Sequence, residues 1–139
     1  MKRKIFILLL LSTIGLANAN SCNTDCYINV DSLFQINLST LKKKVSESAE
    51  CVTITNKANL DFLYVISLLS DMNCISSQNN CVDSNTIQAI ENWYLKKKKF
   101  VTCEKLRKAY SLLRPQVFKS FNEYEEYSKE LDQLKIKEE

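Results

Sequence analysis

Six cysteines are the residues of this chain with the most definite chemistry, because an even number can close as disulfides. They are Cys22, Cys26, Cys51, Cys74, Cys81 and Cys103. The first two are separated by three residues, which differs from the C-x-x-C of redox and zinc motifs, and the chain has no histidine to complete a metal site. The cysteines therefore predict structural disulfides, with no metal and no cofactor.

The absence of histidine and the scarcity of glycine exclude further classes of function. Without histidine the chain has no Ser-His-Asp or Cys-His nucleophile pair and no ordinary pH switch. Its one glycine, Gly15, lies near the N-terminus, so the rest of the chain cannot form a phosphate-binding P-loop or a dinucleotide fingerprint. We predict no catalytic residues and no enzyme activity. A hydrolase built on carboxylates is kept as the third functional hypothesis, and no pair of residues can be nominated for it.

The first nineteen residues have the composition of a cleavable secretory signal. Three basic residues precede the apolar run 5–11, which is too short to span a bilayer, and Ala17 and Ala19 occupy the positions read by a signal peptidase. We expect a signal peptide over residues 1–19, a single helical domain over 20–139, and an exported protein in the periplasm or the medium. A lipid anchor on Cys22 is the less favoured alternative, because Ala19 and Asn20 fit a lipoprotein signal poorly. Cleavage would reduce the net charge from +3 to zero.

Apolar residues recur at helical spacing in five segments, and the predicted mature part contains no glycine for the turns of a sheet. The predicted fold is all-α, a small antiparallel bundle of four to five helices stapled by disulfides. Ser32, Asn85 and Thr102 are expected to cap three of the helices, and the second helix is apolar almost all round, which predicts a central position. The helices are expected over residues 32–51, 59–73, 85–99, 102–113 and 115–137.

The layout of the helices restricts the disulfide pairing. If consecutive helices run antiparallel, Cys51 and Cys103 share one end of the bundle, and the other four cysteines lie at the opposite end. A second helix of about 15 residues spans about 22 Å, far beyond the roughly 7 Å between the Cα atoms of a disulfide. We therefore predict Cys51–Cys103, with Cys22 and Cys26 pairing with Cys74 and Cys81 in either order. The local alternative is Cys74–Cys81 with Cys22–Cys26.

Charge is divided unevenly along the chain. Residues 20–95 carry 4 basic and 8 acidic side chains, residues 96–119 carry 9 and 1, and residues 120–139 carry 3 and 7. The basic segment follows Trp93 and Tyr94 and contains Phe100, so it could contact an acidic protein, anionic lipid or a cell-envelope polymer. Nucleic acid is not an expected partner of a neutral exported domain. The candidate binding surface comprises Trp93, Tyr94, Lys96, Lys97, Lys98, Lys99, Tyr124 and Tyr127.

These observations favour a binding protein over a catalyst. The first hypothesis is an exported, disulfide-stabilised helical protein that recognises another protein, of the inhibitor or immunity type. Such a role requires a rigid scaffold and an exposed surface but no catalytic group. The second hypothesis is a helical protein that binds lipid or a membrane surface through residues 93–108, saposin-like in role although not in the order of its cysteines.

Overall fold

Helices dominate the part of the chain that the structure, a computed structural model, describes: residues 26–48, 50–76, 78–113 and 119–137. The predicted all-α, disulfide-stapled fold is confirmed. The predicted signal peptide, residues 1–19, lies outside the described residues. The elements are α2 (Val30–Ser46), β1 (Val52–Thr53), α3 (Lys57–Leu69), β2 (Cys81–Val82), α4 (Ser84–Lys97), the 3-10 helix η1 (Lys98–Phe100), α5 (Cys103–Leu112) and α6 (Phe121–Leu134).

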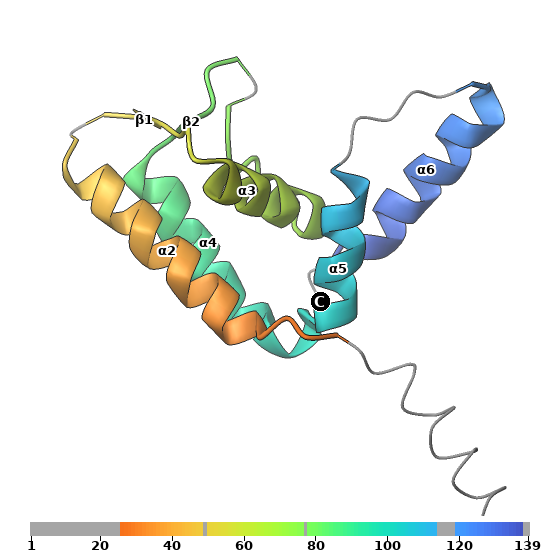
Figure 1. Cartoon of the computed structure of the whole chain (residues 1–139), viewed down its shortest axis with the longest axis horizontal. Helices are drawn as coiled ribbons and strands as arrows, with labels where there is room; N and C mark the ends of the chain where they lie inside the picture. Colours follow the sequence, from red (N-terminus) through yellow and green to blue (C-terminus); the bar gives the residue numbers. More distant parts are fainter. Residues whose placement is uncertain (1–25, 49, 77, 114–118, 138–139) are drawn as a thin grey trace, which may run out of the picture.

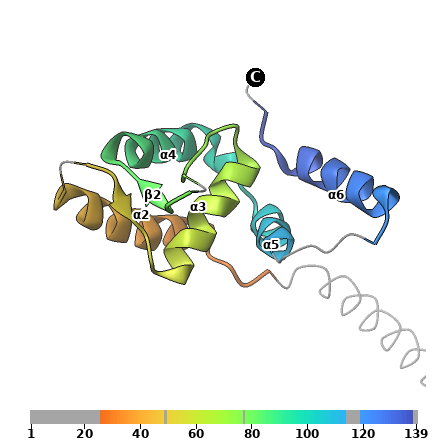
Figure 2. The same cartoon turned by 90° about the horizontal axis from the view of Figure 1, so that it is seen from above.

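The third helix, α3, is the centre of the fold. It lies between a pair formed by α2 and α4 and a pair formed by α5 and α6 (Figures 1 and 2). Five of its apolar side chains are fully buried, in agreement with the predicted central position: Phe62, Leu63, Val65, Ile66 and Leu69. Leu60, Tyr64 and Leu68 are half-buried. Phe34 of α2 meets Phe62 edge-on, with ring centroids 5.1 Å apart, and stacks at 3.7 Å on Tyr94 of α4. Aromatic packing thus joins α2, α3 and α4.

Each of the α-helices α2 to α6 begins at a side chain that accepts a hydrogen bond from a backbone N–H three residues further on. The capping residues are Asn29, Asn56, Asp83, Thr102 and Ser120. The predicted cap at Thr102 is confirmed, whereas those at Ser32 and Asn85 are wrong, because Asn29 and Asp83 offer oxygens earlier in the chain. Helix α2 also ends at Ser46 and not at residue 51. The predicted start of the last helix, Pro115, lies outside the described residues.

A short antiparallel pairing follows α2 and precedes α4. Val52 pairs with Val82 and Thr53 with Cys81, and the Ile54 N–H donates to the Asn80 carbonyl oxygen at 2.8 Å. Asn80 has a φ of +49°, in the left-handed region where glycine is usual. Its side-chain oxygen accepts a hydrogen bond from the Tyr64 hydroxyl at 3.1 Å, which holds this turn against α3. An asparagine therefore serves where a glycine would be expected.

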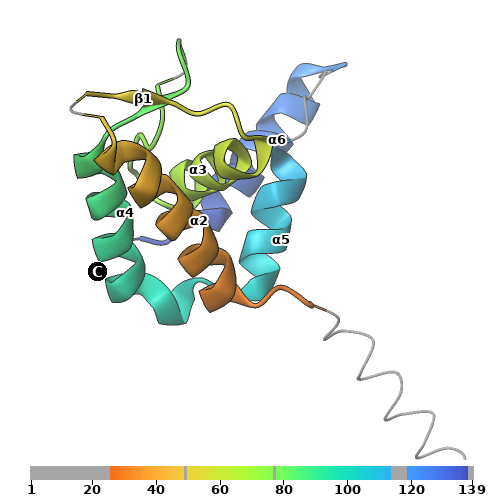
Figure 3. The ribbon, with the colours of Figure 1, turned by 60° about the vertical axis from the view of Figure 1, so that its left-hand side comes forward.

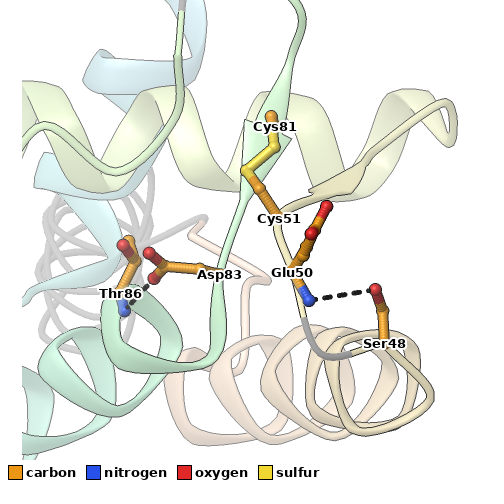
Figure 4. The surroundings of a disulfide bond; sticks show 6 residues. All are labelled: Ser48, Glu50, Cys51, Cys81, Asp83 and Thr86. Atoms are coloured by element: carbon orange, nitrogen blue, oxygen red, sulfur yellow. Dashed lines mark hydrogen bonds between the residues drawn. A yellow bond between two sulfur atoms is a disulfide. The ribbon is translucent and has the colours of Figure 1, made fainter.

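The predicted disulfide between Cys51 and Cys103 is wrong. Cys51 is bonded to Cys81, with Cα atoms 5.6 Å apart (Figure 4), and Cys26 is bonded to Cys103, with Cα atoms 5.9 Å apart. Cys74 is buried with a free thiol, so its predicted disulfide is also wrong. Cys22 lies outside the described residues. Figure 4 shows that this bond joins the residue before β1 to the first residue of β2. Helix α4 follows β2, and Asp83 caps its start by accepting a hydrogen bond from the Thr86 N–H at 2.7 Å.

The error has one physical cause, the connection between α3 and β2. The eleven residues between Leu69 and Cys81 would reach about 36 Å if fully extended, and a 13-residue helix such as α3 is about 20 Å long. The connection therefore can return along the whole length of α3, and it brings Cys81 back beside Cys51 (Figure 1). The connection thus crosses the molecule once more than the predicted alternation of helices allowed. Helix α4 consequently runs antiparallel to α2, and α5 begins beside the start of α2, where Cys103 meets Cys26.

The last helix extends beyond the body of the molecule. In Figures 1 and 3 the Phe121 end of α6 points away from the other helices, while its Leu134 end returns to them. Leu134 is the one residue of α6 that is buried. Within the described residues, no helix combines the length and apolar character needed to span a membrane.

Candidate binding surface

The two aromatic residues predicted to lie on the binding surface, Trp93 and Tyr94, are both in the core. Trp93 is 8% and Tyr94 is 7% exposed. The Tyr94 hydroxyl donates a hydrogen bond to the Asp31 carboxylate, which also pairs with the Lys98 ammonium at 2.9 Å. The hydrogen bond from Tyr94 lowers the pKa of Asp31, with a further contribution from Lys98. Burial, reinforced by Asp31, raises the pKa of Tyr94. These residues therefore hold α4 against α2.

The lysines that follow them do reach the surface. Lys96, Lys98 and Lys99 are exposed, and Lys97 is half-buried. Helix α4 ends at Lys97 and continues into η1, so the four side chains point in different directions around the end of the helix. Lysines here are also favourable for α4 itself, because the C-terminal end of a helix carries a partial negative charge.

The chain's C-terminal segment brings two more lysines to the same place. The Ile136 N–H donates to the Leu69 carbonyl oxygen at 2.8 Å, and the Ile136 side chain is buried. The Lys97 ammonium donates to the Lys137 carbonyl oxygen at 3.1 Å. These contacts fix Lys135 and Lys137 on either side of Ile136, next to the end of α4. Sequence reasoning missed both lysines because nothing in the spacing of residues 120–139 indicates where that segment docks.

Together these side chains form one basic surface, which we call the lysine-rich end. Phe100 lies within it and is 40% exposed. The ammonium groups of Lys97 and Lys99 lie 6.0 and 5.1 Å from the centre of its ring. A small cavity of about 130 Å³ separates this ring from the C-terminal segment and from α5. The lysine-rich end comprises Lys96, Lys97, Lys99, Lys105, Lys135 and Lys137.

Within the part of the chain that the structure describes, few carboxylates pair with these lysines. Lys135 pairs with Asp71 at 3.1 Å, and the neighbouring Lys98 is engaged by Asp31. Within the described ranges, the other five lysines of the surface have no carboxylate oxygen within 4.0 Å of their ammonium nitrogen. Among the described residues, five of its six ammonium groups therefore have no direct carboxylate partner.

A groove of about 520 Å³ opens beside the lysine-rich end. Four apolar residues contribute to its lining: Met72, Ala89, Trp93 and Ile136. Lys96 and Lys97 line it as well, together with Ser70, Asp71 and Asn92. Apolar walls beside a few charged groups, in this range of volumes, are typical of sites that accept a side chain or a small ligand. Trp93 thus belongs to the surface only as part of the groove wall.

The remaining predicted surface residues, Tyr124 and Tyr127, lie elsewhere, on α6. Tyr127 is half-buried, and its hydroxyl donates to the Leu112 carbonyl oxygen at 3.3 Å, near the end of α5 that lies away from Cys103. Tyr124 is 51% exposed and contacts Phe121, which is 72% exposed, with ring centroids 6.4 Å apart. The structure therefore separates the predicted surface into a basic part and an aromatic part. Phe121 was not among the predicted surface residues.

Other chemistry is sparse in the described part of the chain. No three His, Cys, Asp or Glu residues among residues 26–48, 50–76, 78–113 and 119–137 lie close enough to hold a metal ion. The Cys74 thiol is buried, and this burial raises its pKa.

No protein-family model, curated protein or solved structure matches the chain.

Proposed function

We propose that this chain is an exported binding protein that recognises an acidic region of another protein through its lysine-rich end. The observation that carries the proposal is the lysine-rich end with the exposed ring of Phe100 among its lysines. In the described residues, five of its six lysines have no carboxylate oxygen within 4.0 Å of their ammonium nitrogen. This arrangement supplies long-range attraction for a negatively charged partner and an apolar contact at its centre.

The lysines and the apolar residues would contribute differently to binding. Exposed lysines raise the rate of encounter with an acidic partner and make it sensitive to salt, since the Debye length is only about 10 Å at 0.1 M ionic strength. Each exposed ion pair contributes little affinity, so the apolar contacts must supply much of the rest. Phe100 and the groove beside Trp93 are placed to do so.

Disulfides support the cellular location that this function requires. Two intramolecular disulfides indicate an oxidising compartment, because thiols of cytosolic proteins are kept reduced. Export by cleavage after Ala19, into the periplasm or the medium, is part of the proposal. An intact mass that still includes residues 1–19 in exported material would contradict it.

The experiment compares two variants of the mature chain with equal loss of charge. The test variant replaces three exposed or half-buried lysines of the lysine-rich end by glutamine: Lys96, Lys99 and Lys105. The control variant replaces three lysines that lie on α2 and α6: Lys43, Lys44 and Lys129. Each protein is immobilised and exposed to an extract of the cell envelope, at low and at high salt, and retained proteins are quantified by mass spectrometry.

The expected result is an acidic protein retained by the wild type and by the control variant but depleted about tenfold on the test variant and at high salt. Equal retention by both variants would refute the proposed surface. A parallel co-sedimentation uses vesicles of phosphatidylglycerol and phosphatidylethanolamine. Binding to these vesicles, without any retained acidic protein, would overturn the proposal in favour of a lipid surface.

A further inference from the structure

The exposed end of α6 carries the opposite charge to the lysine-rich end, and it also exposes aromatic side chains. Phe121 and Tyr124 expose 72% and 51% of their surface there. Glu125 and Glu126 are also exposed, and neither lies within 4.0 Å of a lysine or arginine nitrogen in the described residues. We call these four residues the aromatic tip. Two large aromatic side chains that are exposed next to each other are suited to anchor a protein contact.

The groove beside the lysine-rich end offers the complementary chemistry. Its apolar lining can receive an aromatic ring, and Lys96 and Lys97 at its edge can face carboxylates next to that ring. Ala89 is an exposed residue of the α4 wall, which leaves the groove open at that point. The positive charge and the apolar lining of the groove thus complement the negative charge and the aromatic rings of the tip, and both surfaces belong to the same chain.

The tip cannot reach the groove of its own molecule. Helix α6 has 14 residues and is therefore about 20 Å long, with Phe121 at one end and Leu134 at the other. The Leu134 end lies next to the groove, because Ile136 lines the groove and donates its backbone N–H to the Leu69 carbonyl oxygen. Midway along α6, the Tyr127 hydroxyl donates a hydrogen bond to the Leu112 carbonyl oxygen at the end of α5. The aromatic tip is therefore kept on the far side of the molecule (Figure 1).

We propose that the aromatic tip binds the lysine-rich groove of a second copy of this chain. The contact joins two different surfaces, so it is heterologous, and it closes as a dimer only if each tip reaches the groove of the other molecule. The proposal is independent of the proposed function. A bound acidic partner would compete with the tip, because both use Lys96 and the same groove.

The experiment uses sedimentation velocity of the mature protein at increasing concentration, at low and high salt. The tip variant carries Phe121→Ser and Tyr124→Ser. The groove variant carries Ala89→Glu and Lys96→Glu, and its control carries Gln88→Glu and Lys43→Glu, which change the charge equally on other exposed positions. All substituted side chains are exposed, so each variant is expected to keep the circular dichroism spectrum of the wild type.

The expected result is salt-sensitive association of the wild type and of the control, and an association constant at least about tenfold lower for the tip variant and for the groove variant. An equal mixture of the two defective variants should form a one-to-one complex, because one intact tip then meets one intact groove. Trp93, the only tryptophan, reports that complex through its fluorescence. A monomeric wild type, or a mixture that forms no complex, would overturn the inference. The tip variant should still retain an acidic partner, which separates this inference from the proposed function.

Discussion

Removal of the Cys26–Cys103 disulfide is expected to destabilise the fold strongly without changing its helical content. This bond ties the segment before α2 to the first residue of α5, 77 residues later in the chain. The Cys51–Cys81 bond lies within that loop and bypasses 30 of its residues. The loop that the outer bond closes in the unfolded chain is therefore roughly 50 residues long, and closing it corresponds to about 4 kcal/mol of stability.

The variant Cys26→Ser with Cys103→Ser tests this estimate. A domain of this size has a stability of roughly 5–15 kcal/mol, so a loss of about 4 kcal/mol leaves it folded at room temperature. The corresponding fall in melting temperature is roughly 10–20 °C. Thermal unfolding followed by far-ultraviolet circular dichroism measures both the melting temperature and the helical content. A decrease in melting temperature of less than about 3 °C would refute the reasoning, as would loss of the helices at room temperature.

Three further outcomes are expected from the described contacts. Asn37→Ala should lower the free energy of unfolding by about 1–3 kcal/mol in urea titrations, because the buried side-chain amide of Asn59 loses its acceptor at 3.0 Å; an unchanged midpoint would contradict this. Asp31→Asn should make the free energy of unfolding fall less steeply as the pH is lowered. The hydrogen bond from Tyr94 lowers the pKa of Asp31 below 3.8, so the ionised carboxylate stabilises the fold above that pH and ceases to do so as the pH falls through the lowered value; identical acid-unfolding curves for the two proteins would argue against it. Cys74 should be alkylated by iodoacetamide only after unfolding, since burial raises the pKa of its thiol, and rapid alkylation of the native protein, or recovery of Cys74 in a disulfide-linked peptide, would show the assignment to be wrong.

The periodicity of the sequence predicted the helices well. The apolar run of α3 identified the central element, and Thr102 identified the start of α5. These features depend on neighbouring residues, so they can be recognised locally. The path between the helices cannot, because the loop from Asp71 to Asn80 has no periodic pattern to show that it returns along α3. The disulfide pairing depended on that path and was consequently wrong.

The candidate surface was predicted in part. The run of lysines at the end of α4 is visible in the sequence, and positive charge is rarely buried. Trp93 and Tyr94 follow the same helical spacing as core residues, and periodicity alone does not distinguish a buried ring from one at the rim. Lys135 and Lys137 join the surface because Ile136 is buried and hydrogen-bonds to Leu69, and because Lys97 donates to the Lys137 carbonyl oxygen. These are long-range contacts without a local signature.

The central claim is that the lysine-rich end binds an acidic protein, and the most direct measurement is the affinity of that protein for the two charge-matched variants. Once the partner retained by the wild type is purified, its dissociation constant is measured by isothermal titration calorimetry. We predict that replacing Lys96, Lys99 and Lys105 by glutamine weakens binding about tenfold or more, and that the control replacements on α2 and α6 leave it within about twofold. Equal affinities for the two variants would contradict the account.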